Sequence, residues 1–392
     1  MASVRALCPI LVGREAELIE LEDALLAAAR GDGRMVLLAG DAGMGKTRLG
    51  LELTERAARI GAAAFSGVCS EAALALPYLP FLEAFGNYVA RSDLDFLRAR
   101  LGTSVEELGL LFPRLGQAPR DAGDPTHAKL RFFEAILHLL EVAAGESGML
   151  LVLEDLQGAD DSTRELLDYI ARRLESTRIL VLGTYRAEEL SRKHPLLTSI
   201  EAWQRNGLAQ VIELRSLDQR DVGGMIEAIF DEPSSSETGR FLHDRCEGNP
   251  FVLEELLKEA LDSGDIFRTE RGWQRKELSA FKLPRTVREA ILLRLERLGP
   301  EQLRMLRAAA VLGDPFPDTA LISVAGGDLP AVHDALRACV QQQLVREDPD
   351  AAGVYHFRHS LTRDAVYADL VSTERLEYHR RAAEVLEECI AH

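Results

Sequence analysis

The chain has 392 residues, of which 47% are hydrophobic and 28% charged, so it is long enough for two or three domains of ordinary soluble composition. The formal net charge of −17 argues against nucleic-acid binding over a broad face, because phosphate contacts need clustered Lys and Arg. No apolar run reaches a membrane span, and the five scattered cysteines lack metal-ligand spacing, so we expect reduced thiols in a cytoplasmic protein that does not bind membranes.

The first strong signal is the stretch MVLLAGDAGMGKTRLG at 35–50. Its apolar start predicts a buried strand, and the spacing of Leu49 and Leu53 predicts a helix after it. The pattern Gly40-x-x-x-x-Gly45-Lys46-Thr47 between them is typical of a phosphate-binding loop, because glycines let backbone N–H groups turn toward an anion. We expect Lys46 to reach the β- and γ-phosphates of ATP and Thr47 to hold Mg²⁺. The predicted nucleotide contacts in this loop are Gly40, Ala42, Gly43, Met44, Gly45, Lys46, Thr47 and Arg48.

Strand-like and helix-like segments alternate up to residue 214, with further strands expected at 62–68, 149–155, 178–185 and 209–214. Such alternation predicts a parallel sheet with helices on both faces. The continuous apolar runs fit strands that are buried on both sides. We therefore predict an α/β P-loop NTPase domain with five parallel strands over residues 1–215.

Two carboxylates, Glu154 and Asp155, end the strand at 149–155, which we expect to neighbour the loop strand. One of them should help to hold Mg²⁺, and the other should orient the attacking water. The usual order makes Glu154 the metal-side group and Asp155 the water-side group, although Asp is the commoner residue in the first place. The candidate magnesium ligands are therefore Thr47, Glu154 and Asp155. Asp160 and Asp161 are better explained as caps of the following helix.

Arg186 follows the strand at 178–185. If this strand lies beside the loop strand, Arg186 can point at the γ-phosphate and stabilise or sense its charge. An ordinary exposed arginine is the alternative. The candidate catalytic residues are Glu154, Asp155 and Arg186.

From residue 216 the strand signal fades. Capped helices and a small hairpin around Gly272 predict a helical, lid-like subdomain over 216–283. Helices near 300–312, 317–325 and 330–343, followed by a strand pair that turns at 349–353, predict a winged-helix domain over 284–372. The segment 373–392 is a helix without a capping glycine, which we interpret as the start of a helical repeat region in a truncated chain. A frayed terminal helix is the alternative.

Several segments occur in a characteristic order: LVGREAELIELEDAL, LVLEDLQGADDSTRELL, LVLGTYRAEEL, EGNPFVLEELL and FRHSLTRDAVYADL. Together they resemble the nucleotide-binding module of the large ATP-binding LuxR-type transcription regulators. Those proteins belong to the signal-transduction ATPases with numerous domains (STAND), a branch of the AAA+-like P-loop proteins. The likeness runs from about residue 10 to the C-terminus; the phosphate loop alone is generic, whereas the ordered set is specific.

The resemblance implies further nucleotide contacts outside the phosphate loop. Val12, Gly13 and Arg14 would line the adenine and ribose side, although the same residues can simply open a helix. Pro250 would pack on the nucleotide, or it only starts a helix. His359 would contact the β-phosphate of ADP, or it is a partly buried histidine. The family usually has an aromatic residue where this chain has Gly158, which puts the hydrolysis rate in doubt.

The leading functional prediction is a weak ATPase that acts as a switch. ADP would stabilise a closed form, and ATP would favour an open form that self-associates. An inducer or partner protein of unknown identity would bias the switch, and DNA would be bound only through a helix-turn-helix beyond residue 392. One alternative is a remodelling or motor ATPase with an arginine supplied in trans, for which Arg172, Arg173 and Arg205 are candidates. The other is a regulatory module of a multidomain cyclase or kinase.

Overall fold

In the computed structural model, the described residues are 7–69, 77–117, 124–191, 193–269, 272–276, 291–292, 294–342, 344–349, 351–358 and 360–391. The chain forms two compact units. The sheet unit comprises Arg14–Asp41 and Gly45–Arg215. The C-terminal unit comprises Met1–Gly13, Ala42–Met44 and Ser216–His392. The domain boundaries expected from the sequence stay predictions.

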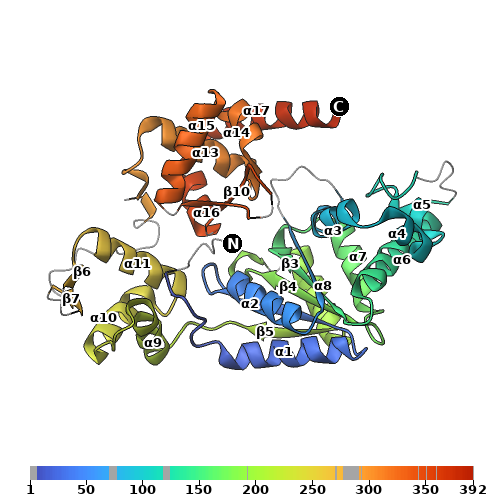
Figure 1. Ribbon diagram of the computed structural model, residues 1–392, viewed down its shortest axis with the longest axis horizontal. Coiled ribbons are helices and arrows are strands. Elements are labelled where there is room, and N and C mark those ends of the chain that lie inside the picture. Colours follow the sequence, from blue (N-terminus) through green and yellow to red (C-terminus); the bar gives the residue numbers. More distant parts are fainter. Residues whose placement is uncertain are drawn as a thin grey trace. The chain divides into compact units, whose positions relative to one another are not determined.

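The sheet unit contains the predicted sheet of five parallel strands (Figure 1). Its strands are β1 (Arg34–Ala39), β2 (Ala63–Val68), β3 (Met149–Glu154), β4 (Ile179–Tyr185) and β5 (Ala209–Glu213), in the order β2-β3-β4-β1-β5. β4 pairs with β1, so the strand before Arg186 does lie beside the loop strand, as the proposed role of Arg186 requires. The expectation that β3 neighbours β1 is wrong, because β4 lies between them. The carboxyl ends of all these parallel strands still meet at one edge of the sheet.

Helices connect and cover the strands of the sheet unit. They are α1 (Glu15–Ala29), α2 (Lys46–Arg59), α3 (Leu79–Arg91), α4 (Leu94–Leu101), α5 (Ser104–Leu108), α6 (Pro125–Ala144), α7 (Asp161–Ala171) and α8 (Pro195–Arg205), with short 3-10 turns η1 (Leu156–Gly158) and η2 (Ala187–Glu189). α1, α2 and α6 all contact the inner strands β3 and β4. Every residue of β4 is buried, which explains the unbroken apolar runs of the sequence.

The C-terminal unit begins with helices α9 (Gln219–Phe230), α10 (Ser236–Cys246) and α11 (Pro250–Asp262), followed by the hairpin β6 (Ile266–Thr269)–β7 (Gly272–Arg275). Asp218 caps α9 in a capping box with Asp221, as the sequence predicted for the start of this helix. All ten residues from Phe251 to Ala260 of α11 are buried, including four charged side chains. The strand pair of β6 and β7 matches the predicted hairpin, but Gly272, expected in its turn, is the first residue of β7 and pairs with Thr269.

The remainder of this unit contains α13 (Pro300–Leu312), β8 (Phe316–Pro317), α14 (Asp318–Ala325), α15 (Leu329–Gln341), β9 (Val345–Glu347), β10 (Val354–Phe357), α16 (Ser360–Asp369) and α17 (Ser372–Ala391). The expected strand pair is joined by β8 in an antiparallel sheet of order β8-β10-β9. Residues 277–290, which include the predicted boundary between the helical subdomain and the winged-helix domain, lie outside the described residues. Within the described part of the chain, no helix is long and apolar enough to cross a membrane.

Candidate functional site

The loop between β1 and α2 has the conformation that its glycines permit. Gly43 has a φ of 83° and Gly45 a φ of 94°, in the left-handed region. A Cβ on Gly45 would meet no atom within 4 Å, so backbone conformation rather than crowding favours glycine there. The N-cap residue of α2 is Gly45, which has no side chain to accept the first N–H groups of the helix, so these groups are suited to face an anion. Met44 is buried, whereas Ala42 and Arg48 are half-buried.

Lys46 is the first residue of α2, and its side chain folds back over the loop. Its ammonium group donates hydrogen bonds to Gly40 O at 2.6 Å and to Asp41 O at 2.9 Å. Only 8% of the residue is exposed. Burial lowers the pKa of Lys46, while the nearby Asp155 and Glu188 carboxylates act in the opposite direction. The loop therefore holds one buried cation, bound to carbonyl oxygens that a phosphate can replace as acceptor.

Thr47 lies next to Lys46 and reaches the end of β3. Its Oγ1 donates a hydrogen bond of 2.5 Å to Glu154 Oε2, although β3 is two strands away from β1. The first turn of α2 therefore reaches across β4 to the end of β3. A hydroxyl and a carboxylate oxygen at this separation are hard ligands of the kind Mg²⁺ prefers. The described residues hold no group of three or more His, Cys, Asp or Glu side chains suited to a metal, and Mg²⁺ usually relies on one or two carboxylates, waters and phosphate oxygens.

Asp155 has a left-handed backbone, with φ 54° and ψ 49°, which is uncommon for a residue other than glycine. Its backbone N–H donates to Thr184 Oγ1 at 3.1 Å, at the end of β4. Its Oδ1 lies 3.5 Å from Arg186 Nε. The structure therefore brings Asp155 and Arg186 together at the carboxyl ends of two adjacent strands. Arg186 is only 8% exposed, so it is not the ordinary surface arginine considered as the alternative.

Three more side chains belong to this cluster, and the sequence did not single them out. Gln157 bonds both Asp155 Oδ1 and the backbone of Arg186. A hydrogen bond to Glu188 and burial raise the pKa of Asp41, against the effect of Lys46. The resulting carboxyl pair lies beside the loop lysine, so the site contains more acid than the motif alone predicts.

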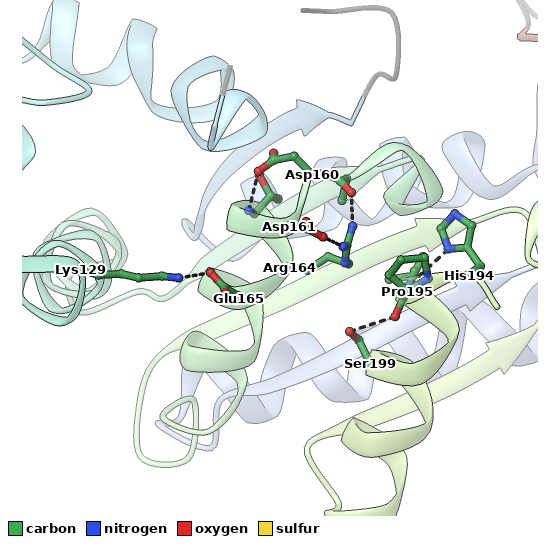
Figure 2. Close-up of polar contacts among 11 residues, drawn as sticks. Lys129, Asp160, Asp161, Arg164, Glu165, His194, Pro195 and Ser199 are labelled. Carbon is green, nitrogen blue, oxygen red and sulfur yellow. Dashed lines mark hydrogen bonds and ion pairs between the residues drawn. The ribbon is translucent and has the colours of Figure 1, made fainter. Parts of the chain in front are cut away.

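The two aspartates after η1 serve α7, as the sequence predicted. Asp160 Oδ1 accepts the Thr163 N–H at 3.0 Å, so Asp160 is the N-cap (Figure 2). Asp161 is the first residue of the helix, and Figure 2 shows its carboxylate bonded to Arg164. These contacts give both carboxylates a role in the helix itself, so we assign neither to a metal or phosphate.

The residues expected on the adenine side are divided between the units. Val12 and Gly13 belong to the C-terminal unit, where a Cβ on Gly13 would approach the Asp221 carboxylate to 2.6 Å. Gly13 also has a φ of 67°, so glycine is required there for two reasons. Arg14 belongs to the sheet unit, and its Nη2 donates to Arg215 O at 2.6 Å. Arg14 is buried by these contacts.

Pro250 is the first residue of α11, where proline is favoured. Its neighbour Asn249 makes the contacts that the sequence did not predict. Asn249 Oδ1 caps the helix by accepting the N–H groups of Phe251 and Val252, and Nδ2 donates to Ala42 O at 3.0 Å. Ala42–Met44 belongs to the same unit as α11, so this bond fixes part of the phosphate loop within that unit. The predicted site residue His359 lies outside the described residues.

The sequence of the chain is similar to that of a known protein family and of a curated protein. Residues 10–182 match a family model described as an AAA ATPase domain. An uncharacterized protein of Rhizobium meliloti (strain 1021) is 26% identical over 398 residues, covering 95% of this chain and 36% of that protein. The chain therefore spans about a third of the length of this curated relative. The match confirms the predicted AAA ATPase domain but not the more specific LuxR-type assignment.

The comparison with solved structures concerns the fold alone, because the sequence identities are low. A STAND protein with a tetratricopeptide repeat sensor from Pyrococcus horikoshii is 14% identical, with a TM-score of 0.50, covering 99% of this chain and 47% of that chain. The ORC1 protein of Aeropyrum pernix, solved in complex with DNA, is 14% identical with a TM-score of 0.42, covering 93% of this chain and 94% of that chain. The first likeness shows the P-loop ATPase fold; the second is too distant to carry an argument.

Proposed function

We propose that the chain is the ATP-binding, slowly hydrolysing switch module of a LuxR-type, STAND-class transcription regulator. The observation that carries the ATPase part is the convergence of Thr47 and Glu154 beside the paired Asp155 and Arg186. The match of residues 10–182 to an AAA ATPase domain supports nucleotide binding. The regulatory part rests on the order of sequence motifs over the whole chain.

The phosphate loop would bind the nucleotide through its backbone. The N–H groups of the loop and of the first turn of α2 face the phosphates, and Lys46 exchanges its bonds to Gly40 O and Asp41 O for phosphate oxygens. Thr47 and Glu154 would hold Mg²⁺, directly or through water. When bound, the ion neutralises charge on the β- and γ-phosphates.

Hydrolysis would depend on the ends of β3 and β4. The Asp155 carboxylate is the candidate that orients the attacking water, because Glu154 is already engaged with Thr47. Arg186 would stabilise negative charge on the γ-phosphate, and its Nη1 is held by Glu189 at 2.7 Å. Gly158 N–H closes the turn after β3 by bonding Asp155 O at 2.8 Å, so a glycine in place of the usual aromatic residue keeps the turn but supplies no packing. We therefore propose slow turnover.

We propose that residues 284–372 form a winged-helix domain. The order α13, β8, α14, α15, β9, β10, with three antiparallel strands, supports this interpretation. α15 carries a single arginine and is otherwise neutral or weakly charged, so we do not assign it to DNA. In this proposal DNA binding resides in a helix-turn-helix that is not among these 392 residues.

The switch would act through differential binding. ADP stabilises the closed form, with His359 at the β-phosphate, and ATP stabilises an open form that self-associates. Changing from mostly closed to mostly open needs about 5 kcal/mol of differential affinity, part of which an inducer or partner protein can supply. The test is sedimentation velocity of the chain with saturating Mg–ADP and with a slowly hydrolysed Mg–ATP analogue. The proposal predicts a larger species with the ATP analogue; identical sedimentation with both nucleotides contradicts it, and rapid turnover that rises with protein concentration favours a motor ATPase.

A further inference from the structure

The turn after β3 contains a buried glutamine that the proposed reaction has not used. Gln157 is 8% exposed, and both ends of its amide are engaged. Its Nε2 donates to Asp155 Oδ1 at 3.0 Å, and its Oε1 accepts the backbone N–H of Arg186 at 3.2 Å. An amide side chain can donate through its nitrogen and accept through its oxygen at the same time without carrying charge. Gln157 therefore joins the end of β3 to the residue that follows β4.

These bonds act unequally on the two oxygens of the Asp155 carboxylate. Oδ1 accepts from Gln157 and faces Arg186 Nε at 3.5 Å. Among the described residues, no hydrogen bond is donated to Oδ2. The Asp155 side chain is 31% exposed, so solvent reaches it. One oxygen is thus anchored, and the other can accept a hydrogen bond from water.

The backbone around this carboxylate is fixed as well. The Asp155 N–H is held by Thr184 Oγ1, and Thr184 is only 2% exposed. Gly158 N–H and Ala159 N–H close the turn on Asp155 O and Leu156 O, at 2.8 and 3.0 Å. With the backbone held, Asp155 can still rotate its side chain, and the hydrogen bond from Gln157 restricts that rotation. Restricting a catalytic group to its productive direction raises the rate of the chemical step without requiring tighter binding.

We propose that Gln157 is a positioning residue for ATP hydrolysis: it anchors Asp155 Oδ1 to the end of β4 and so directs Oδ2 at the attacking water. This inference rests on the proposed ATPase function. Gln157 contacts Asp155 and the Arg186 backbone rather than the phosphate loop, so it should influence kcat and leave nucleotide binding unchanged.

Two substitutions separate the donor from the acceptor. Gln157→Glu keeps an acceptor for the Arg186 N–H but replaces the Nε2 donor with a charged oxygen, and Gln157→Met removes both bonds at similar length. We expect kcat for Mg–ATP to fall about 10- to 100-fold in each, with KM and the ATP dissociation constant within about twofold of the parent. The matched control is Gln204→Glu on α8, which makes the same charge change at an exposed position and should leave kcat unchanged.

A coupling measurement distinguishes positioning from a general structural role. In a chain that already carries Asp155→Asn, adding Gln157→Met should cause no further loss of residual turnover, because Gln157 acts through Asp155. Unchanged kcat in both Gln157 variants would overturn the inference. So would a loss of ATP affinity or a fall in melting temperature that accounts for the loss of rate. If the unsubstituted chain binds no ATP, the proposed function itself is refuted. If the unsubstituted chain hydrolyses ATP and the Gln157 variants hydrolyse it equally fast, only the inference about Gln157 is refuted.

Discussion

Replacement of Lys46 by alanine tests the phosphate-loop assignment most stringently. In the structure the ammonium group binds Gly40 O and Asp41 O, and we propose that ATP draws it to the β- and γ-phosphates. The bonds to the carbonyls are already charge-assisted because the lysine is ionised, but phosphate oxygens also carry the opposite charge. If each of two bonds gains about 1.5 kcal/mol in the exchange, the net gain is about 3 kcal/mol. Its loss corresponds to an increase of about 100-fold in the dissociation constant of Mg–ATP.

The effect on folding should be much smaller. Lys46→Ala leaves two carbonyls without their donor, but it also removes a buried cation whose desolvation already lowers the pKa of Lys46. These terms oppose each other, so we expect the free energy of unfolding to change by no more than about 1 kcal/mol. Titration calorimetry with Mg–ATP and urea unfolding measure the two quantities on the same sample. Lys129→Ala is the matched control, since Lys129 is exposed and pairs with Glu165. Retained ATP affinity in a folded Lys46→Ala chain would refute the assignment.

Three further predictions follow from the geometry. Asp155→Asn should keep ATP affinity and lose hydrolysis in a phosphate-release assay, and unchanged turnover would move the water-side role to Glu154. Asn249→Ala removes the N-cap of α11 and a bond to the loop, so it should lower stability by about 1 kcal/mol and weaken ATP binding, whereas Asn206→Ala, an exposed helix-end residue, should do neither. Burial acts to lower the pKa of His356, but its two aspartate partners, each at 2.9 Å, raise it overall. The charged pairs of His356 therefore stabilise the fold fully below the pKa that the histidine has in the unfolded chain, and this stabilisation is lost as the pH rises through its pKa in the folded chain. His356→Gln should lower the melting temperature more at pH 6 than at pH 9. An equal loss at both pH values would contradict a raised pKa.

The inner strands β1, β3 and β4 could be predicted from the sequence because each contains a short, unbroken apolar run, but the order of the strands could not. β3 and β1 are separated by β4, and the order depends on how the connecting helices cross the sheet rather than on local pattern. The third strand of the small sheet was missed because β8 has only two residues, too few to show alternation.

In the candidate site, too, residues close together in sequence could be predicted, whereas contacts between distant residues could not. Gly43, Gly45, Lys46 and Thr47 are adjacent in sequence, so their spacing alone identifies the loop. The contact between Asn249 and Ala42 joins residues 207 positions apart, and only the fold reveals it. Gln157 lies two residues from Asp155, but a polar residue in a turn gives no signal until β4 is seen beside it.

We propose that the chain is a nucleotide switch that exchanges its nucleotide slowly. The most direct measurement is to denature the protein as purified, with no nucleotide added, and to identify and count what it releases. We expect close to one ADP per chain, because a closed form that exchanges slowly retains its product. An empty site in a folded chain would contradict it.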